Sequence, residues 1–220
     1  MRRLLIAALL LASSLCGVPA VKADDTAGDF DLYVLSLSWS PEYCAANRDD
    51  KAQCGLDRQL GLVVHGLWPQ YEASRNGADW PANCPVSRLR KLPPGVTAVY
   101  PTENLFRHEW REHGSCSGLS PAAYLDFTRR LYQRFQAPAP LQQPDKAQSL
   151  PARDLRRAVL SANPGLPPDG VVLACKGNRL SELRLCFTKA ANGKFRACPV
   201  SMIADATRGC PSRIRIRPLP

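Results

Sequence analysis

Cysteine content is the feature that most restricts how this chain can fold. Nine cysteines occur in 220 residues, and all but Cys16 lie beyond an apolar N-terminal segment. An even number of cysteines behind an export signal predicts disulfides formed in an oxidising compartment. Eight cysteines allow about 105 pairings, so spacing alone leaves the connectivity open. The sequence contains no Cys-x-x-Cys pair, which disfavours a zinc-ribbon site. The eight residues are Cys44, Cys54, Cys84, Cys116, Cys175, Cys186, Cys198 and Cys210.

The first 23 residues have the pattern of a secretory signal peptide. Two arginines precede an apolar run over residues 4–15, and small residues around Ala23 offer a cleavage site. We therefore expect one mature domain over residues 24–220, secreted or periplasmic. The apolar run is too short to span a membrane, so no membrane anchor is expected. A lipid anchor at Cys16 is the alternative.

The charge of the chain favours an acidic partner. Its 29 lysines and arginines exceed its 19 aspartates and glutamates. Three of the basic residues fall within the first 23, so the predicted mature chain carries a net charge of +7. A basic exported protein suits polyanions such as nucleic acid, although a solvated basic surface explains the same charge.

Hydrophobic periodicity predicts several strands. Apolar residues alternate with serines over residues 35–40, which indicates a strand with one buried face. A second strand is predicted over residues 62–64, with His65 at its end and Pro69 closing it. Further strands are predicted over residues 171–173, 183–187 and 194–197, with a hairpin turn at Asn192-Gly193. The tail with Arg213, Arg215 and Arg217 is predicted as an edge strand whose basic face is solvated or touches RNA.

Helix signals alternate with these strands. Helices are predicted over residues 103–113 with Thr102 as N-cap, from Ser120-Pro121 onward, and over residues 152–162. Residues 72–101 are predicted as an irregular surface segment, and residues 136–148 as a loop. The helix after Ser120 places one face inward, formed by Tyr124, Phe127, Leu131 and Phe135. Without βαβ regularity, the pattern favours a single-domain α+β fold with an antiparallel-dominated central sheet, several packed helices and four disulfides.

The three histidines of the chain fall in two short segments. His65 opens the segment HGLWP, and His108 and His113 lie in HEWREHGSC. His108 and His113 are about 140° apart around a helix, so the i,i+4 pattern of zinc proteases fails by one residue. We expect no metal and no cofactor. A three-histidine metal site formed by an irregular turn is the alternative.

Acid–base chemistry fits the spacing better. Glu109 and His113 are i and i+4 on the predicted helix, where a carboxylate would orient the imidazole. His65 would face this helix across a cleft. Two imidazoles suit cleavage of a phosphodiester beside a 2′-hydroxyl, because one removes a proton and the other donates one. His108 is the candidate for the cation that stabilises the added phosphate charge.

Both segments resemble the active-site segments of the T2-type ribonucleases, which are transferase-type endoribonucleases of low base specificity. Residues 30–44 and 174–187 resemble the opening and C-terminal strands of that family. The resemblance implies that His65 is the general acid and His113 the general base. It also implies that His108 binds the phosphate and that Glu109 assists there.

The resemblance extends to the base sites and to the disulfides. Trp68 matches a base-stacking aromatic, and Leu105 falls where the family places an apolar residue in a second base pocket. Tyr71 is a further candidate for stacking, whereas Trp110 is expected in the core. The implied pairs are Cys84–Cys116, Cys175–Cys210 and Cys186–Cys198, which leaves Cys44–Cys54.

One position departs from the family pattern. Glu112 stands just before the second-segment histidine, where the family commonly has a lysine that stabilises the phosphorane. Arg111 is adjacent and is a candidate substrate-binding residue, but it lies about 100° around the helix. Glu112 is i+4 from His108 and is expected to hold that imidazole protonated.

These observations predict a monomeric endoribonuclease that cleaves RNA through a 2′,3′-cyclic phosphate to 3′-phosphate products. DNA is expected to be inert, because it lacks the attacking hydroxyl. One alternative is an exported RNA-binding member of the same fold that is weak or inactive. Another is a metal-dependent phosphodiesterase, which a chelator would inhibit.

Overall fold

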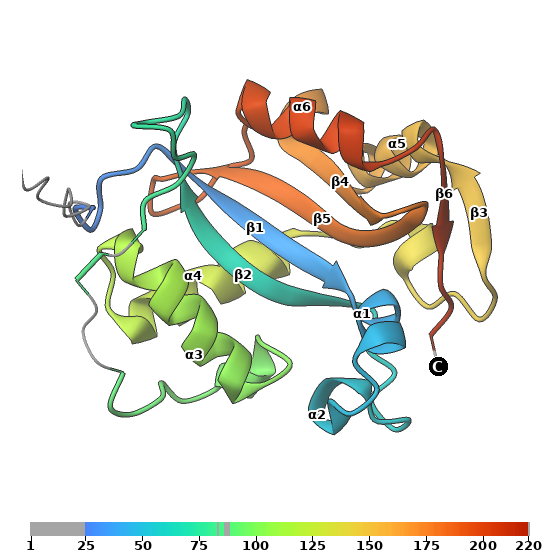
Figure 1. Ribbon diagram of the computed structural model, residues 1–220, viewed down its shortest axis with the longest axis horizontal. Helices are drawn as coiled ribbons and strands as arrows, with labels where there is room; N and C mark the ends of the chain where they lie inside the picture. The colour runs from blue at the N-terminus through green and yellow to red at the C-terminus, as the bar shows by residue number, and fades with distance from the viewer. Residues whose placement is uncertain (1–24, 83, 86–88, 220) are drawn as a thin grey trace, which may run out of the picture.

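A mixed sheet of six strands forms the centre of the molecule (Figure 1). The computed structural model describes residues 25–82, 84–85 and 89–219, so the predicted signal peptide lies outside them. The strands follow the order β2-β1-β5-β6-β3, and β4 pairs with β5. Every pairing is antiparallel except the short contact of β5 with β6. The strands are β1 (Leu32–Trp39), β2 (Leu62–Gln70), β3 (Gln148–Pro151), β4 (Val171–Lys176), β5 (Arg179–Thr188) and β6 (Arg213–Ile216).

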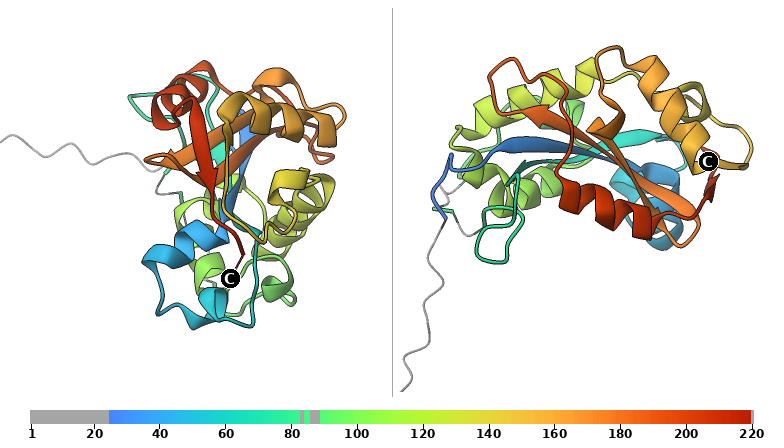
Figure 2. Two further views of the ribbon diagram at one scale, coloured as in Figure 1. Left: turned by 90° about the vertical axis from the view of Figure 1, so that its right-hand side faces the viewer. Right: turned by 90° about the horizontal axis from the view of Figure 1, so that it is seen from above.

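Helices cover both faces of this sheet. The two views of Figure 2 place α4 and α5 on one side and α6 on the other. The bounds are α1 (Ser40–Ala46), α2 (Lys51–Cys54), α3 (Glu103–Glu112), α4 (Pro121–Arg134), α5 (Ala152–Ala162) and α6 (Val200–Gly209). This arrangement confirms the predicted α+β fold class. None of the helices in the described ranges is long and apolar enough to cross a membrane.

The helix-start signals are confirmed by the geometry of the caps. The Thr102 side chain accepts a hydrogen bond from the backbone N–H of Leu105, and Ser120 accepts one from Ala123. Each bond satisfies a donor that the first helical turn leaves unpaired. The predicted inward face of α4 is buried as expected. The end of α3 differs from the prediction: the helix stops at Glu112, and His113 adopts non-helical angles as its C-cap.

Strand β1 is buried on both faces rather than on one. It lies between β2 and β5, so helices cover its apolar residues on one side while α6 and the site described below lie on the other. Ser36, predicted on a solvent face, is completely buried. The alternating pattern was misleading because both faces of this sheet are covered at β1, whereas many antiparallel sheets leave one face to solvent.

Strand β2 runs through the position where the sequence predicted its end. Pro69 lies inside the strand, which is possible because β2 is an edge strand and a missing N–H on its outer side costs no ladder bond. The pairing with β1 skips one residue: Ser36 faces Gly66 and Leu37 faces Val64, so His65 is a β-bulge. A bulge re-aims the side chains on either side of it.

The bulge has a visible effect on packing. Val64 and Leu67 are three residues apart, yet both are fully buried in the larger core. A regular strand would have turned them to opposite faces. His65 and Trp68 are therefore both turned to the other face, toward the site.

Other elements correct the sequence predictions. Residues 194–197 form no strand and make one isolated bridge, Phe187 with Phe195. The basic tail is not an edge strand: β6 lies between β5 and β3, and β3, which begins at the last residue of the predicted loop, was not predicted. Its Ile214 and Ile216 are buried. The sequence analysis also missed α1, α2 and α6.

All four implied disulfides are present. The pairs are Cys44–Cys54, Cys84–Cys116, Cys175–Cys210 and Cys186–Cys198. Cys84–Cys116 fastens the irregular segment over residues 72–101 to the turn that follows His113. The covalent framework therefore holds the segment beside the candidate site in place.

Candidate active site

The bulge of β2, the C-terminal half of α3 and the centre of β5 meet on one face of the sheet. His65 comes from β2, Glu109 from α3 and Glu182 from β5. Segments far apart in the sequence thus place titratable side chains within a few ångströms of each other.

The imidazole of His65 lies between two carboxylates. Its Nδ1 is 2.7 Å from Oε1 of Glu182, and its Nε2 is 3.5 Å from Oε1 of Glu109. Burial acts to lower the pKa of His65, but the bond with Glu182 and the neighbouring negative charges outweigh it and raise the pKa. The side chain is still 34% exposed, so a charged imidazole is accessible from the cleft.

Glu109 is a carboxylic acid buried beside this imidazole. Its side chain is only 1% exposed, and its Oε2 accepts a hydrogen bond of 2.7 Å from Nε1 of Trp68. Burial raises the pKa of Glu109 to about 7, although His65 and Trp68 act in the opposite direction. This group therefore changes its protonation state near neutral pH.

Gly66 leaves the space that this arrangement needs. A Cβ atom at residue 66 would lie 2.0 Å from Oε2 of Glu109 and 2.3 Å from Nε1 of Trp68. Any side chain would collide with both partners of that hydrogen bond. The glycine of the HGLWP segment is thus explained by the close approach of α3 to β2.

His113, the residue that follows α3, approaches the same indole ring. The ring centroids of His113 and Trp68 are 5.4 Å apart, and those of His65 and Trp68 are 5.3 Å apart. Nδ1 of His113 is buried and has no hydrogen-bond partner among the described residues. Burial lowers the pKa of His113 to about 4, so the ring is neutral at neutral pH. The two imidazoles therefore converge on Trp68, one favouring the charged form and one the neutral form.

The expected pairing of Glu109 with His113 is wrong. The Glu109 carboxylate contacts His65 and Trp68 instead. The i,i+4 relation holds only inside a helix, and α3 ends one residue before His113. His113 therefore leaves the helical face that carries Glu109.

Glu112 and His108 are linked through Arg111 rather than by a direct ion pair, although the two groups still interact through their charges. Arg111 donates from Nε to Glu112 Oε1 over 2.7 Å and from Nη2 to His108 Nδ1 over 3.2 Å. This hydrogen bond from Arg111 lowers the pKa of Glu112. Nε2 of His108 lies 4.0 Å from Oε1 of Glu109, so His108 stands at the rim of the same cluster. The Arg111 side chain is mostly exposed and adds a positive charge there.

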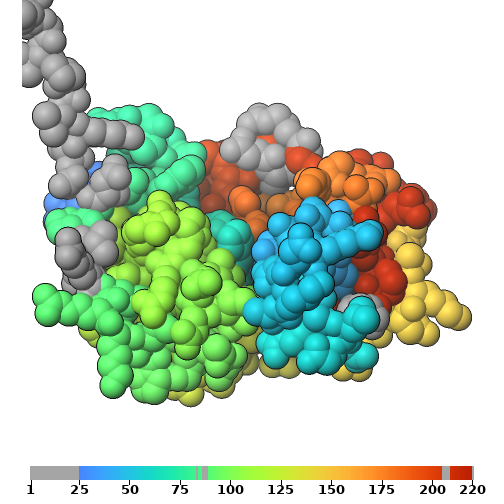
Figure 3. All heavy atoms as spheres, turned by 60° about the horizontal axis from the view of Figure 1, so that its bottom comes forward, coloured from blue at the N-terminus to red at the C-terminus, as the bar shows by residue number. Residues whose placement is uncertain are grey.

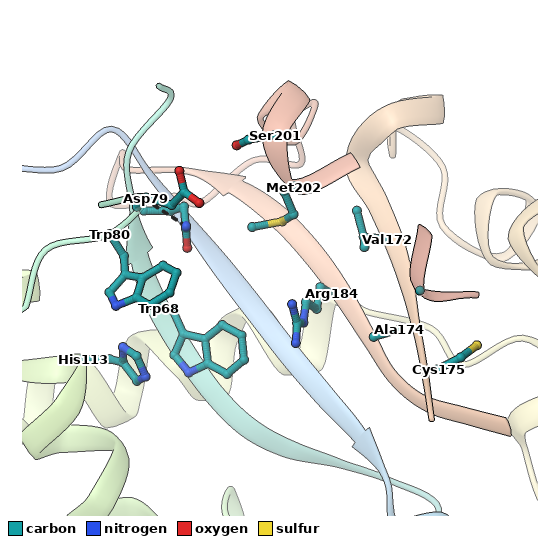
Figure 4. Close-up of a pocket in the computed structure, with 12 residues that line it drawn as sticks. Trp68, Asp79, Trp80, His113, Val172, Ala174, Cys175, Arg184, Ser201 and Met202 are labelled. Atoms are coloured by element: carbon teal, nitrogen blue, oxygen red, sulfur yellow. Dashed lines mark hydrogen bonds between the residues drawn. The ribbon is translucent and has the colours of Figure 1, made fainter. Parts of the chain in front are cut away.

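Two pockets open beside the histidines. The first, of about 420 Å³, is lined by Trp68, Trp80, His113, Arg184 and Met202 among others. Figure 4 shows the two indoles and His113 on one side of it and Arg184 pointing toward Trp68 from β5. The second, of about 440 Å³, contains His65, Leu105 and Glu182. In Figure 3 the surface is hollowed between the α1–α2 segment and the segment that contains α3. The histidine cluster therefore lies between two pockets.

The remaining predicted site residues fall in different places. Leu105 lines the second pocket, and Trp68 lines the first. Tyr71 is instead buried in the core, and the Arg75 guanidinium covers its ring at 4.2 Å, so no base can stack on it. Trp110 is buried as expected.

Sequence reasoning missed Glu182 and Arg184. Both lie on β5 and face the histidine side of the sheet, where Oε2 of Glu182 accepts two hydrogen bonds from the Arg184 guanidinium. A signal was present: two opposite charges at i and i+2 inside the apolar segment Leu180–Phe187. Charges on one face of an interior strand require a buried partner or a site.

This cluster can give and take protons at one place. An imidazole whose pKa is raised, an imidazole whose pKa is lowered to about 4 and a carboxyl group whose pKa is raised to about 7 surround Trp68. Within the described ranges no three His, Cys, Asp or Glu side chains are arranged to hold a metal ion. The site is therefore a candidate for general acid–base catalysis.

Known proteins with similar sequences and folds are ribonucleases or related proteins. The chain is 43% identical over 123 residues to a ribonuclease of Aeromonas hydrophila, covering 56% of this chain and 54% of the relative. It is 30% identical to ribonuclease I of Escherichia coli over 171 residues, covering 60% and 63%. The matched region thus spans about half of the first curated relative.

A solved structure has the same fold. The RNase-related protein from Calystegia sepium matches with a TM-score of 0.62 at 20% identity, covering 86% of this chain and 98% of that chain. The sequence model of the Ribonuclease T2 family matches residues 30–198, which include both histidine segments and both β5 charges. The chain belongs to the Ribonuclease T2 family.

Proposed function

We propose that this protein is an endoribonuclease that cleaves RNA by attack of the 2′-hydroxyl on the adjacent phosphorus. A 2′,3′-cyclic phosphate forms as the 5′-oxygen leaves, and its hydrolysis yields a 3′-phosphate. The observation that carries the proposal is the convergence of His65 and His113 on Trp68 with opposite preferences for the proton. Membership of the Ribonuclease T2 family supports it.

His113 is the proposed general base. Burial keeps its pKa at about 4, so its imidazole is neutral over most of the acidic and neutral range and can accept the 2′-hydroxyl proton. Its position on the first pocket, beside Trp68 and Trp80, places it where a nucleoside can stack. Stacking on an indole tolerates every base, which supports low base specificity.

His65 is the proposed general acid. The Glu109 and Glu182 carboxylates favour its protonated form, and its Nε2 faces the cluster. The proton on Nε2 passes to the departing 5′-oxygen. In the second step the roles reverse: His65 takes a proton from water and His113 returns one to the 2′-oxygen.

The phosphate charge is proposed to be met by His108, Glu109 and Arg111. His108 and Arg111 supply donors at the rim, and the Glu109 carboxylate, 4.0 Å from Nε2 of His108 and 3.5 Å from Nε2 of His65, holds the two imidazoles beside the phosphate. Donors placed where charge develops lower the barrier most. With Glu112 at the usual lysine position, Arg111, which contacts His108, supplies a fixed positive charge from α3. The four disulfides support a site of action in an oxidising compartment outside the cytoplasm.

Product analysis tests this proposal. Purified protein is incubated with a short RNA and with the matching DNA, each in excess EDTA, and the products are separated by mass spectrometry. The expected result is RNA cleaved to 2′,3′-cyclic phosphate and then 3′-phosphate ends, with DNA intact. The variant His113→Ala should lower the rate by at least about 100-fold. Intact RNA, cleaved DNA or activity lost with EDTA would each contradict the proposal.

A further inference from the structure

Strand β5 brings a second pair of charges to the histidine cluster across the width of the sheet. Glu182 and Arg184 pair in register with Ser38 and Ser36 of β1, the strand that separates β5 from β2. Because serine is small, the face of β1 that carries Ser36 and Ser38 leaves room for long side chains from the two flanking strands. His65 and Glu182 meet in that space, although neither strand pairs with the other.

Glu182 uses its two oxygens for different partners. Oε1 accepts the hydrogen bond from Nδ1 of His65 at 2.7 Å, and Ser38 Oγ lies 3.4 Å from the same oxygen. Oε2 accepts from Nε and Nη2 of Arg184 at 3.0 and 2.8 Å. The carboxylate is only 13% exposed, so these contacts replace water as its partners. Burial alone would raise the pKa of Glu182, but His65 and Arg184 lower it to about 2.

The hydrogen bond between His65 and Glu182 determines which nitrogen of His65 faces the cluster. With Nδ1–H donated to Glu182, the ring presents Nε2, which lies 3.5 Å from Oε1 of Glu109. Turning the ring over would break a charge-assisted hydrogen bond in a largely buried place. We propose that Glu182, held by Arg184, is a positioning residue that orients His65 and keeps it in the protonated state needed to donate to the leaving oxygen. The assignment rests on the proposed function of His65 as the acid.

Two substitutions separate orientation from charge. In Glu182→Gln the amide oxygen can still accept from Nδ1, but the negative charge is gone. Loss of an adjacent opposite charge shifts a pKa by about 1–3 units, so His65 should lose its proton at lower pH. Glu182→Ala removes the orientation as well and should lower the rate at every pH.

The experiment has two readouts on the same proteins. The pKa of His65 is measured by NMR from its imidazole C–H signals, and kcat/KM for a dinucleotide is measured from pH 4 to 9. For Glu182→Gln we expect the pKa of His65 and the alkaline limb of the kcat/KM profile to fall together by at least about 1 unit, a tenfold loss of rate on that limb. The pKa of His113 should stay unchanged. Glu72→Gln, which removes an exposed carboxylate paired with Arg196, is the matched control and should move neither.

The outcomes distinguish this inference from the proposed function. An unchanged His65 pKa in folded Glu182→Gln, or an alkaline limb that stays in place while the pKa falls, would overturn the role of Glu182. Wild-type protein without ribonuclease activity would overturn the proposed function. In that case the NMR titration would still decide whether Glu182 controls the proton on His65. If Glu182→Ala fails to fold, Glu182→Gln alone carries the test, because it has nearly the same shape.

Discussion

The Glu109 carboxyl group shows how single residues in this protein combine stability with chemistry. A carboxyl group whose side chain is only 1% exposed is costly to ionise, and burial therefore raises its pKa to about 7. The unfolded chain would ionise it near pH 4.3. Between about pH 4.3 and about pH 7 only the unfolded chain is ionised at this residue. The free energy of unfolding therefore falls as the pH rises through this range and stays at the lower value above it.

Replacing Glu109 by Gln should therefore stabilise the protein at alkaline pH while lowering its activity. Glutamine keeps an oxygen for Trp68 but carries no charge. We expect the free energy of unfolding at pH 8 to rise by on the order of 3–4 kcal/mol relative to wild type. The gain should vanish at pH 4, where both side chains are neutral. Urea titrations at the two pH values measure this, and an equal effect at both would contradict the assigned pKa.

The two histidines should set opposite limbs of the pH profile. His113 must be neutral, so kcat/KM should rise as the pH passes about 4. His65 must be protonated, and its raised pKa places the falling limb above the usual histidine value of about 6.5. A dinucleotide assay across this range measures both limbs. A profile whose acid limb lies near the ordinary histidine value would show that burial does not control His113.

At the residue level, the sequence indicated which side chains gather at the candidate site but not how they pair. His65, His108, Glu109 and His113 all lie at the cluster, as the histidine segments predicted. The partner of Glu109 could not be predicted, because it depends on where α3 ends and on a bulge in another element. Glu182 was missed because its partner is 117 residues away.

At the level of elements, the bulge in β2 positions the site. It turns His65 and Trp68 to one face while Val64 and Leu67 remain in the core. Helices with N-cap residues and the alternating strand β6 were predictable from local signals, whereas β3 and the interior place of β6 depend on the pairing of distant segments. Local periodicity could not reveal the bulge either, since it exists only relative to the register of β1.

Gly66→Ala tests the close approach of β2 and α3. A methyl group there would collide with Glu109 and Trp68, and both are held by other contacts. We expect a loss of about 1–3 kcal/mol in the free energy of unfolding, together with a large fall in kcat. Gly209→Ala is the control, because no described atom beyond its own helix backbone and chain neighbours lies within 4 Å of the added Cβ. Equal stability of the two variants in thermal unfolding would be inconsistent with the described packing.

At the level of the whole molecule, the disulfides differ in what they enclose. Cys84–Cys116 closes a separation of 32 residues and is buried, whereas Cys44–Cys54 closes 10 residues. Longer loops lose more chain entropy on cross-linking. The pairing itself was predictable only through the resemblance, because spacing leaves many connectivities open.

Removing the longer cross-link should therefore destabilise the protein more. We expect the variant Cys84→Ala/Cys116→Ala to lose about 1 kcal/mol more than Cys44→Ala/Cys54→Ala. The first should also lower activity, because it frees the segment tied beside His113. Denaturant midpoints and rates measured in parallel provide the comparison. A larger loss in the second variant would contradict the ranking.

The most direct test of the two-histidine mechanism compares leaving groups. A dinucleotide needs a proton on its departing 5′-oxygen, whereas a nucleoside 3′-(4-nitrophenyl phosphate) releases a weakly basic phenolate that needs none. His65→Ala should lose at least about 100-fold in kcat/KM on the dinucleotide and little on the aryl ester, while His113→Ala should lose activity on both. Equal losses of His65→Ala on the two substrates would contradict the assignment of His65 as the proton donor.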